Sequence, residues 1–293
     1  HGGETVKQTL NYFDAVWIEQ KQQLGTGHAV QQAIHHVEDA DTVLILYGDV
    51  PLLKAQTLQT LLQDVSAQSL ALLTVELDDP TGYGRIVRNA ENAVVKIVEQ
   101  KDANPAELAI REGNTGILAC NGDQLKHWLA CLSNNNAQNE YYLTDIIEMA
   151  VADGLTIKTT VASSQDEVLG VNNRNQLAHL ERVYQLQQAQ NLMEHGVTLR
   201  DPTRIDGTNR IGSNVKIGAN CILKNATIAE GVEILANSLI EDSSVGAFSR
   251  IGPFARLRPA SVIADHAHIG NFVEIKKSTV ASGSKINHLS YIG

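Results

Sequence analysis

From Ile211 onward, a branched aliphatic residue recurs about every six positions. The series is Ile211, Ile217, Leu223, Ile228, Ile234, Ile240, Val245, Ile251, Leu257, Ile263, Ile269, Ile275, Val280, Ile286 and Ile292. A small or slim residue usually follows four positions later. A period of six fits neither an amphipathic helix nor a hairpin meander. It is typical of a triangular parallel β-helix, in which three short strands make one coil and the aliphatic side chains fill the interior.

The N-terminal half alternates continuous apolar runs with helical patterns. Residues 43–47 and 70–75 predict strands buried on both faces of a mostly parallel sheet, and residues 26–36 and 54–66 predict helices. This alternation indicates a doubly wound α/β domain, in which ligands bind beyond the carboxyl ends of the strands. Asp49 follows the first run and is therefore a candidate ligand residue. By itself it is equally well interpreted as a helix N-cap or turn residue.

Glycine-containing segments at 23–28, 80–85, 114–116 and 170–173 predict backbone-exposing loops. The first precedes a helix, where backbone N–H groups and the Thr26 hydroxyl can face a uracil or a phosphate. Each segment taken alone is more often an ordinary turn.

Residues 175–194 contain no Gly or Pro and predict a long helix, ended by Gly196 as a left-handed C-cap. The expected organisation is an α/β domain at 1–174, a linker helix and connector at 175–206, and a β-helix at 207–293. The helical spacing of Leu177, Leu180 and Tyr184 is typical of packing.

Composition narrows the possible functions. The net charge of −10 is spread along the chain, which argues against a nucleic-acid-binding surface. No apolar run reaches bilayer length and no signal peptide is visible, so no membrane association is expected. Three scattered cysteines, Cys120, Cys131 and Cys221, indicate reduced thiols in a cytoplasmic protein.

Several segments together resemble one family. They are residues 23–29, 46–52, 79–85, 114–117, 140–145, 170–174, 252–259, 270–277 and 287–293. Their order and spacing are similar to those of the bacterial bifunctional N-acetylglucosamine-1-phosphate uridylyltransferases / glucosamine-1-phosphate N-acetyltransferases. The resemblance covers nearly the whole chain.

The resemblance implies two reactions. The β-helix would transfer acetyl from acetyl-CoA to glucosamine 1-phosphate. The N-terminal domain would then join the product to UTP with Mg²⁺, giving UDP-N-acetylglucosamine and pyrophosphate for peptidoglycan and lipopolysaccharide synthesis. A homotrimer formed through the β-helix is implied, with acetyltransferase sites between subunits.

The resemblance also implies the residues of the uridylyltransferase site. Asp49 and Asn172 would hold Mg²⁺, a hard cation that prefers oxygen ligands. The remaining contacts would come from Gln20, Gly25 and Thr26 to uracil, from Gly84, Glu99 and Asn114 to the amino-sugar, and from Tyr47 and Gly48 beside the sugar nucleotide.

For the acetyltransferase site, the resemblance implies that His288 is the general base, since an imidazole suits proton transfer near neutral pH. Arg258 and Lys276 would clamp the sugar phosphate, and Tyr291 would contact the same substrate. Eighteen residues separate Arg258 from Lys276, about one coil, so their side chains are expected to stack on one face.

The chain departs from the family at four places. Both ends look cut, because the family's Gly-rich triphosphate loop and first strand have no counterpart and the hexapeptides stop without a capping element. We therefore expect a fragment without uridylyl transfer and with weak or no acetyl transfer. Residues 206–211 span about one coil less than in the family, and Pro259-Ala260 replaces the usual Pro-Gly.

Two alternatives remain open. A single-activity sugar-1-phosphate nucleotidyltransferase could carry the β-helix only as an oligomerisation module. A non-catalytic trimeric rod could carry a degenerate nucleotide fold. The combination of Arg258, Lys276, His288 and Tyr291 argues against the first, and the presence of Asp49 and Asn172 argues against the second.

Overall fold

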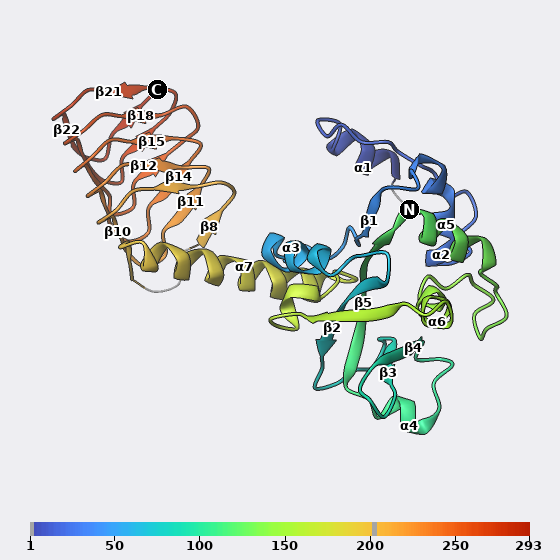
Figure 1. Ribbon diagram of the computed structural model, residues 1–293. Helices are drawn as coiled ribbons and strands as arrows, with labels where there is room; N and C mark the ends of the chain where they lie inside the picture. Colours follow the sequence, from blue (N-terminus) through green and yellow to red (C-terminus); the bar gives the residue numbers. More distant parts are fainter. Residues whose placement is uncertain (1–2, 201–203) are drawn as a thin grey trace. The chain divides into compact units, whose positions relative to one another are not determined.

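The computed structural model describes residues 3–200 and 204–293. It divides into two compact units, His1–Asn173 and Arg174–Gly293, each considered by itself below (Figure 1). Residues 201–203, part of the expected connector, lie outside the described residues.

The first unit is an α/β domain around one mixed sheet. Its strands are β1 (Thr42–Ile45), β2 (Ser69–Glu76), β3 (Arg85–Arg88), β4 (Val94–Val98), β5 (Glu112–Asn121) and β6 (Thr156–Val161). Its helices are α1 (Gly3–Thr9), α2 (Thr26–Ala33), η1 (Ile34–His36), α3 (Ala55–Gln63), α4 (Pro105–Leu108), α5 (Gly122–Cys131), α6 (Asp145–Ala152) and η2 (Asp166–Val168). The strand order is β4-β3-β5-β2-β6, and β1 pairs with β5.

Helices cover both faces of this sheet, as the alternation of elements predicted. Along β2, Leu70 and Leu72 belong to the hydrophobic cluster that includes residues of α5 and α6. The intervening Ala71 and Leu73 belong to a second cluster with Leu61 of α3. Successive side chains of a strand point to opposite faces, so this partition shows that β2 is buried on both sides.

The sheet is less parallel than expected. Among the described pairs, β2 and β6 run parallel, whereas β1–β5, β2–β5, β3–β4 and β3–β5 are antiparallel. The expectation that 43–47 is fully buried is also wrong, because Val43, Leu44 and Ile45 are half-buried and Leu46 is 47% exposed. The described partner of β1 is β5, so only one of its edges is covered.

The second unit begins with the long helix α7 (Arg174–Glu194). It ends as the sequence predicted, because Gly196 adopts φ 84°. The Gly196 N–H donates to the Met193 carbonyl at 3.1 Å and the Val197 N–H donates to the Leu192 carbonyl at 3.1 Å. These are the two hydrogen bonds of a Schellman cap. Leu180 is buried, whereas Leu177 and Tyr184 are exposed.

The remainder of this unit is a β-helix of parallel strands, matching the left-handed type (Figure 1). One sheet contains β7 (Thr198–Leu199), β10 (Lys216–Ile217), β13 (Glu233–Ile234), β16 (Arg250–Ile251), β19 (His268–Asn271) and β22 (Lys285–His288). The next contains β8 (Arg204–Asp206), β11 (Ile222–Lys224), β14 (Leu239–Glu241), β17 (Arg256–Leu257), β20 (Glu274–Ile275) and β23 (Tyr291–Ile292). The third contains β9 (Arg210–Ile211), β12 (Thr227–Ile228), β15 (Ser244–Val245), β18 (Val262–Ile263) and β21 (Thr279–Val280).

The aliphatic series forms the interior of this coil. Ile217 stacks on Ile234, then on Ile251 and Ile269, and all four are buried. The coil starts earlier than the expected residue 207, since β7 pairs with β10 and β8 pairs with β11. Residues 206–211 cause no break in register, because β8 and β9 each pair with the strand one coil onward. Loss of one whole coil would leave such a register intact.

Corners of the coil carry non-glycine residues in the left-handed region, among them Phe254 and Phe272, whose rings stack with centroids 5.1 Å apart. Ala260, where the resemblance led us to expect Gly, has φ 63°. Across the helices that the structure describes, none is both long and apolar enough to cross a bilayer.

Candidate functional site

Asp49 and Asn172 come together in the first unit. Asp49 follows β1, and Asn172 follows η2, on a loop that meets the Asp49 segment through a hydrogen bond from the Val171 N–H to the Asp49 carbonyl at 2.9 Å. Between them lies Gly170. A Cβ at this glycine would be 3.3 Å from Asp49 Oδ2 and 3.8 Å from Asn172 Nδ2, so the amide oxygen of Asn172 would face a cation only after the amide turns over. The space beside the two polar side chains therefore exists because residue 170 has no side chain.

This arrangement fits a divalent cation. A carboxylate and a side-chain amide supply the oxygen ligands that Mg²⁺ prefers, and Mg²⁺ takes few protein ligands because it keeps several waters. Within the described residues, no group of three or more His, Cys, Asp or Glu side chains forms a fuller metal cage. The pair is thus suited to an ion shared with a phosphate-bearing substrate and poorly suited to an all-protein structural site.

Tyr47 lies next to this pair. Its ring packs beside Gly116, where a Cβ would contact the ring, and against the cluster around Leu73. Burial, then the charges of Glu99 and Asp49, raise the pKa of the Tyr47 hydroxyl, and a hydrogen bond from Thr26 opposes the shift. Thr26 therefore contacts the phenol, and the charges of Glu99 and Asp49 act on it, although the three residues come from separate segments.

Gly84, Glu99 and Asn114 also converge. The Asn114 N–H donates to the Gly84 carbonyl at 2.8 Å. A Cβ at Gly84 would lie 3.5 Å from Glu99 Oε1 and 3.5 Å from Asn114 Cβ. The structure therefore brings together the three residues expected to hold the amino-sugar.

Sequence reasoning missed Thr144. Its hydroxyl donates to Glu99 Oε1 at 3.0 Å, and it makes no N-capping hydrogen bond to α6, which begins at the next residue. Burial raises the pKa of Glu99, the Thr144 hydrogen bond lowers it, and Asp102 raises it again. Thr144 stands in the segment 140–145 that matched the family, but its spacing carried no signal for this partner.

Gln20, Gly25 and Thr26 line one hollow, together with Gln23, Ala29 and Glu140. Gln20 Nε2 donates to the Gly25 carbonyl at 3.1 Å. Gly25 has φ 106°, and a Cβ there would lie 2.6 Å from the Tyr141 carbonyl oxygen. Only glycine fits this turn, because both its backbone angle and its contact with residue 141 exclude a side chain.

A second hollow beside Glu99 is strongly acidic. Its lining includes Asp102, Asp145 and Glu148 as well as Glu99. Burial, followed by the charges of Glu148, Glu99 and Asp102, raises the pKa of Asp145 to about 6. Burial, with repulsion from the neighbouring carboxyls added to it, therefore brings the pKa of Asp145 close to neutral pH.

In the second unit, Arg258 and Lys276 stack as their spacing predicted. The Arg258 N–H donates to the Ile275 carbonyl, one residue before Lys276, at 2.8 Å. Arg258 also forms an ion pair with Glu274, with Nη1 and Oε1 2.9 Å apart. A phosphate that used Arg258 would therefore compete with a carboxylate already present on the same face.

His288 lies on a different sheet of the coil from this pair of cations, whereas Tyr291 lies on the same sheet as they do. His288 ends β22 and stacks on Asn271 of β19, whereas Arg258 and Lys276 follow strands of the β8–β23 sheet. Tyr291 belongs to that sheet and stacks on Glu274. Within one chain, then, the imidazole is at the corner before this sheet and the cations are at the corner after it. Both His288 and Tyr291 are exposed.

Two family models match the chain in agreement with its two units. A model described as the MobA-like NTP transferase domain matches residues 1–138. A model described as the GMPPB C-terminal domain matches residues 188–293.

Relatives match over both units at once. The bifunctional protein GlmU of Methylococcus capsulatus is 57% identical over 314 aligned residues, which cover all of this chain and 68% of the relative. Those of Marinobacter nauticus and Stutzerimonas stutzeri are each 52% identical over 313 residues, covering all of this chain and 69% of each relative. Because this chain has 293 residues, the relatives carry residues within the aligned stretch that it lacks.

Proposed function

The chain belongs to the family of the bifunctional GlmU proteins, nucleotidyltransferases and acetyltransferases that make UDP-N-acetylglucosamine, and from this premise we propose a role for each of its candidate site residues. The observation that carries the proposal is the convergence, within one unit, of Asp49 with Asn172 and of Gly84 with Glu99 and Asn114.

For uridylyl transfer, Asp49 and Asn172 hold Mg²⁺. When bound, the ion neutralises phosphate charge during attack of the sugar phosphate on the α-phosphorus of UTP. The protein's own groups bind and orient the reactants. Gln20, Gly25 and Thr26 contact uracil in the hollow that they line. Tyr47 and Gly48 flank the sugar nucleotide.

The amino-sugar is held by Gly84, Glu99 and Asn114. Glu99 accepts hydrogen bonds from sugar hydroxyls, and the Thr144 hydroxyl, 3.0 Å from Oε1, fixes the direction of its carboxylate. Gly84 keeps the approach open, because a Cβ there would stand 3.5 Å from Glu99 Oε1. Preorganised contacts of this kind contribute most of the specificity of a polar ligand site.

For acetyl transfer, Arg258 and Lys276 bind the phosphate of glucosamine 1-phosphate, and Tyr291 contacts the same substrate. His288 accepts the proton lost by the amine as its nitrogen attacks the thioester carbon of acetyl-CoA, and the CoA thiolate leaves. Since His288 and the two cations occupy different corners of one chain, we propose that a neighbouring chain in a homotrimer completes each site. We place both reactions in the cytoplasm.

Calorimetric titration tests the first site. UDP-N-acetylglucosamine is titrated into the whole chain with Mg²⁺ and, in parallel, with EDTA. Saturable binding that weakens with EDTA supports the proposal. The variant Gly84→Val should bind at least about tenfold more weakly, because the added methyl groups fill the space between Ile97 and Glu99. Unchanged binding by Gly84→Val, or binding unaffected by EDTA, would count against this site.

A further inference from the structure

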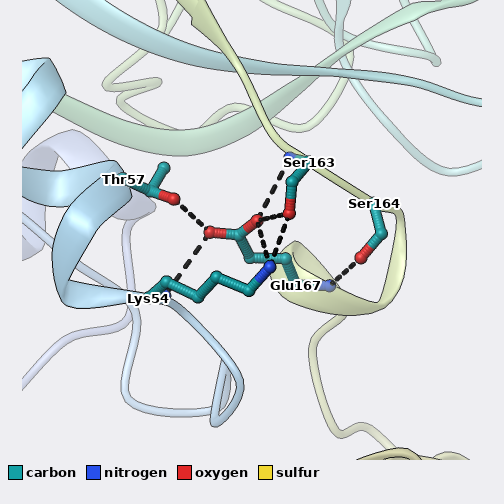
Figure 2. A network of polar contacts seen from close by, with 5 residues as sticks. All are labelled: Lys54, Thr57, Ser163, Ser164 and Glu167. Atoms are coloured by element: carbon teal, nitrogen blue, oxygen red, sulfur yellow. Dashed lines mark hydrogen bonds and ion pairs between the residues drawn. The ribbon is translucent and has the colours of Figure 1, made fainter. Parts of the chain in front are cut away.

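Glu167, in η2, is a carboxylate with no solvent-exposed side-chain surface. It accepts hydrogen bonds from the Ser163 N–H at 3.1 Å and the Ser163 hydroxyl at 2.6 Å. The Thr57 hydroxyl also donates to it, and the Lys54 N–H lies 3.4 Å from Oε1 (Figure 2). Burial raises the pKa of Glu167, but the hydrogen bonds from Ser163 and Thr57 outweigh it and lower the pKa overall.

The partners of Glu167 come from two segments distant in sequence. Lys54 and Thr57 belong to the start of α3, where Lys54 is the N-cap. Ser163 belongs to the turn that precedes η2, and its hydroxyl also accepts from Lys54 Nζ at 2.7 Å. In Figure 2 these side chains close around the carboxylate from both sides. Glu167 therefore joins the N-terminus of α3 to the loop that contains it.

Each joined segment leads to one of the two candidate cation ligands. Asp49 precedes Lys54 by five residues, and Asn172 follows Glu167 by five residues. A second connection, the hydrogen bond from the Val171 N–H to the Asp49 carbonyl, joins the same two segments nearer the ligands. At least two connections among the described residues thus set the mutual position of Asp49 and Asn172, and Glu167 supplies a buried one.

We propose that Glu167 is a positioning residue for the divalent-cation site, holding the Asp49 loop and the Asn172 loop at the separation that one ion requires. Its hydrogen bonds described above are to Lys54, Thr57 and Ser163, so it acts through the backbone of both loops. This inference rests on the proposed function, because it takes Asp49 and Asn172 as the ligands. It differs from a stabilising role, which would change the free energy of unfolding and leave the cation affinity of folded molecules unaltered.

The test measures Mn²⁺ affinity by the loss of the free-ion EPR signal, using the whole chain in the presence of UDP-N-acetylglucosamine. Glu167→Gln keeps the shape but places an amide NH₂ against donors that require an acceptor. We expect Mn²⁺ to bind about tenfold more weakly, as when groups that orient metal ligands are changed. The control is Glu112→Gln, which removes another largely buried carboxylate, paired with Arg88 at 2.7 Å, from the same unit. It should change the affinity less than twofold.

A pair of substitutions at Thr57 covers the case in which Glu167→Gln fails to fold. Thr57→Val removes the hydroxyl that donates to Glu167, and Thr57→Ser keeps it. We expect weaker Mn²⁺ binding with Val and near-parental binding with Ser. Thermal unfolding of each variant, followed by circular dichroism, confirms that folded protein is being compared.

The outcomes separate the two proposals. If the parent chain binds Mn²⁺ and folded Glu167→Gln binds it equally well, the role of Glu167 is wrong and the proposed function stands. If Thr57→Val and Thr57→Ser bind alike, the same conclusion follows. If the parent chain binds no Mn²⁺ in the presence of UDP-N-acetylglucosamine, the cation site itself is wrong and this inference fails with it.

Discussion

The two candidate sites are assembled in different ways. In the α/β unit, residues from separate loops and strand ends meet around Tyr47 and Asp49, and each depends on hydrogen bonds between segments far apart in sequence. In the β-helix, Arg258 and Lys276 are stacked by register, because every coil repeats the same backbone position. In a repeat, the position of a side chain can therefore be derived from its spacing in the sequence. In a doubly wound domain it depends on tertiary contacts, which the spacing does not reveal.

The units also have separate hydrophobic cores, so a substitution in one core should shift the unfolding midpoint of that unit and leave that of the other unchanged. Ile251→Ala removes a fully buried side chain from the coil interior and should cost about 3 kcal/mol in that unit. Both tryptophans, Trp17 and Trp128, belong to the first unit. Urea unfolding followed by circular dichroism should shift, while tryptophan fluorescence stays at the parental midpoint. A joint shift of both signals would mean that the units unfold as one.

Placing glycine at one corner of the coil should raise the stability of the β-helix. Ala260 has φ 63°, which is unfavourable for a residue with a Cβ. Ala260→Gly should stabilise the β-helix by about 1 kcal/mol, since the relief of strain exceeds the added entropy of the unfolded chain. The measurement is the urea midpoint by circular dichroism. Ala247→Gly is the control. Ala247 does not have a positive φ, so glycine there relieves no strain and should lower the stability of the β-helix.

The raised pKa of Asp145 should make the free energy of unfolding of the α/β unit depend on pH. The folded-state pKa of Asp145 is raised to about 6, so its contribution to stability is fully present below its ordinary pKa and is lost as pH rises through 6. Asp145→Asn should therefore gain stability over the parent from pH 5 to pH 8. Because Asp145 is partly exposed, the gain should be below about 1 kcal/mol. Urea unfolding by tryptophan fluorescence at both pH values measures it, and an equal difference at both would contradict the assignment.

The smallest expected change is in affinity for glucosamine 1-phosphate when the ion pair between Arg258 and Glu274 is broken. Glu274→Gln removes a carboxylate that competes with phosphate for the guanidinium. Affinity for glucosamine 1-phosphate should rise about threefold, in keeping with the modest strength of exposed ion pairs. Calorimetric titration measures this change, with Glu233→Gln, on a different sheet of the coil, as the control. A loss of affinity would show that Glu274 itself holds the substrate.

These differences explain what the sequence could predict. The hexapeptide period predicted the coil, its interior and the stacking of Arg258 on Lys276, because each follows from spacing alone. The Schellman end of α7 followed from Gly196 in the same way. The partial exposure of β1 could not be predicted from the sequence, because an apolar run does not indicate whether one or two strands flank it.

Within the site, family resemblance identified the ligand residues but not the groups that hold them. Thr144 occupies an N-cap position, where its ordinary role would be to cap α6, yet its hydroxyl donates to Glu99. Glu167 is a charged residue in a polar stretch and would be expected at the surface, but its carboxylate is buried. Both are recognisable only when the distant partner is in place, because hydrogen bonds across more than forty residues leave no periodic signal.

The central claim is that Asp49 and Asn172 bind one ion, and a double-mutant cycle tests it most directly. Mg²⁺-dependent affinity for UDP-N-acetylglucosamine is measured for the parent chain, Asp49→Asn, Asn172→Ala and the double variant. If both residues serve the same ion, either substitution removes most of the dependence on Mg²⁺ and the second adds little to the first. Additive losses, with a separate response to Mg²⁺ in each single variant, would contradict the shared site.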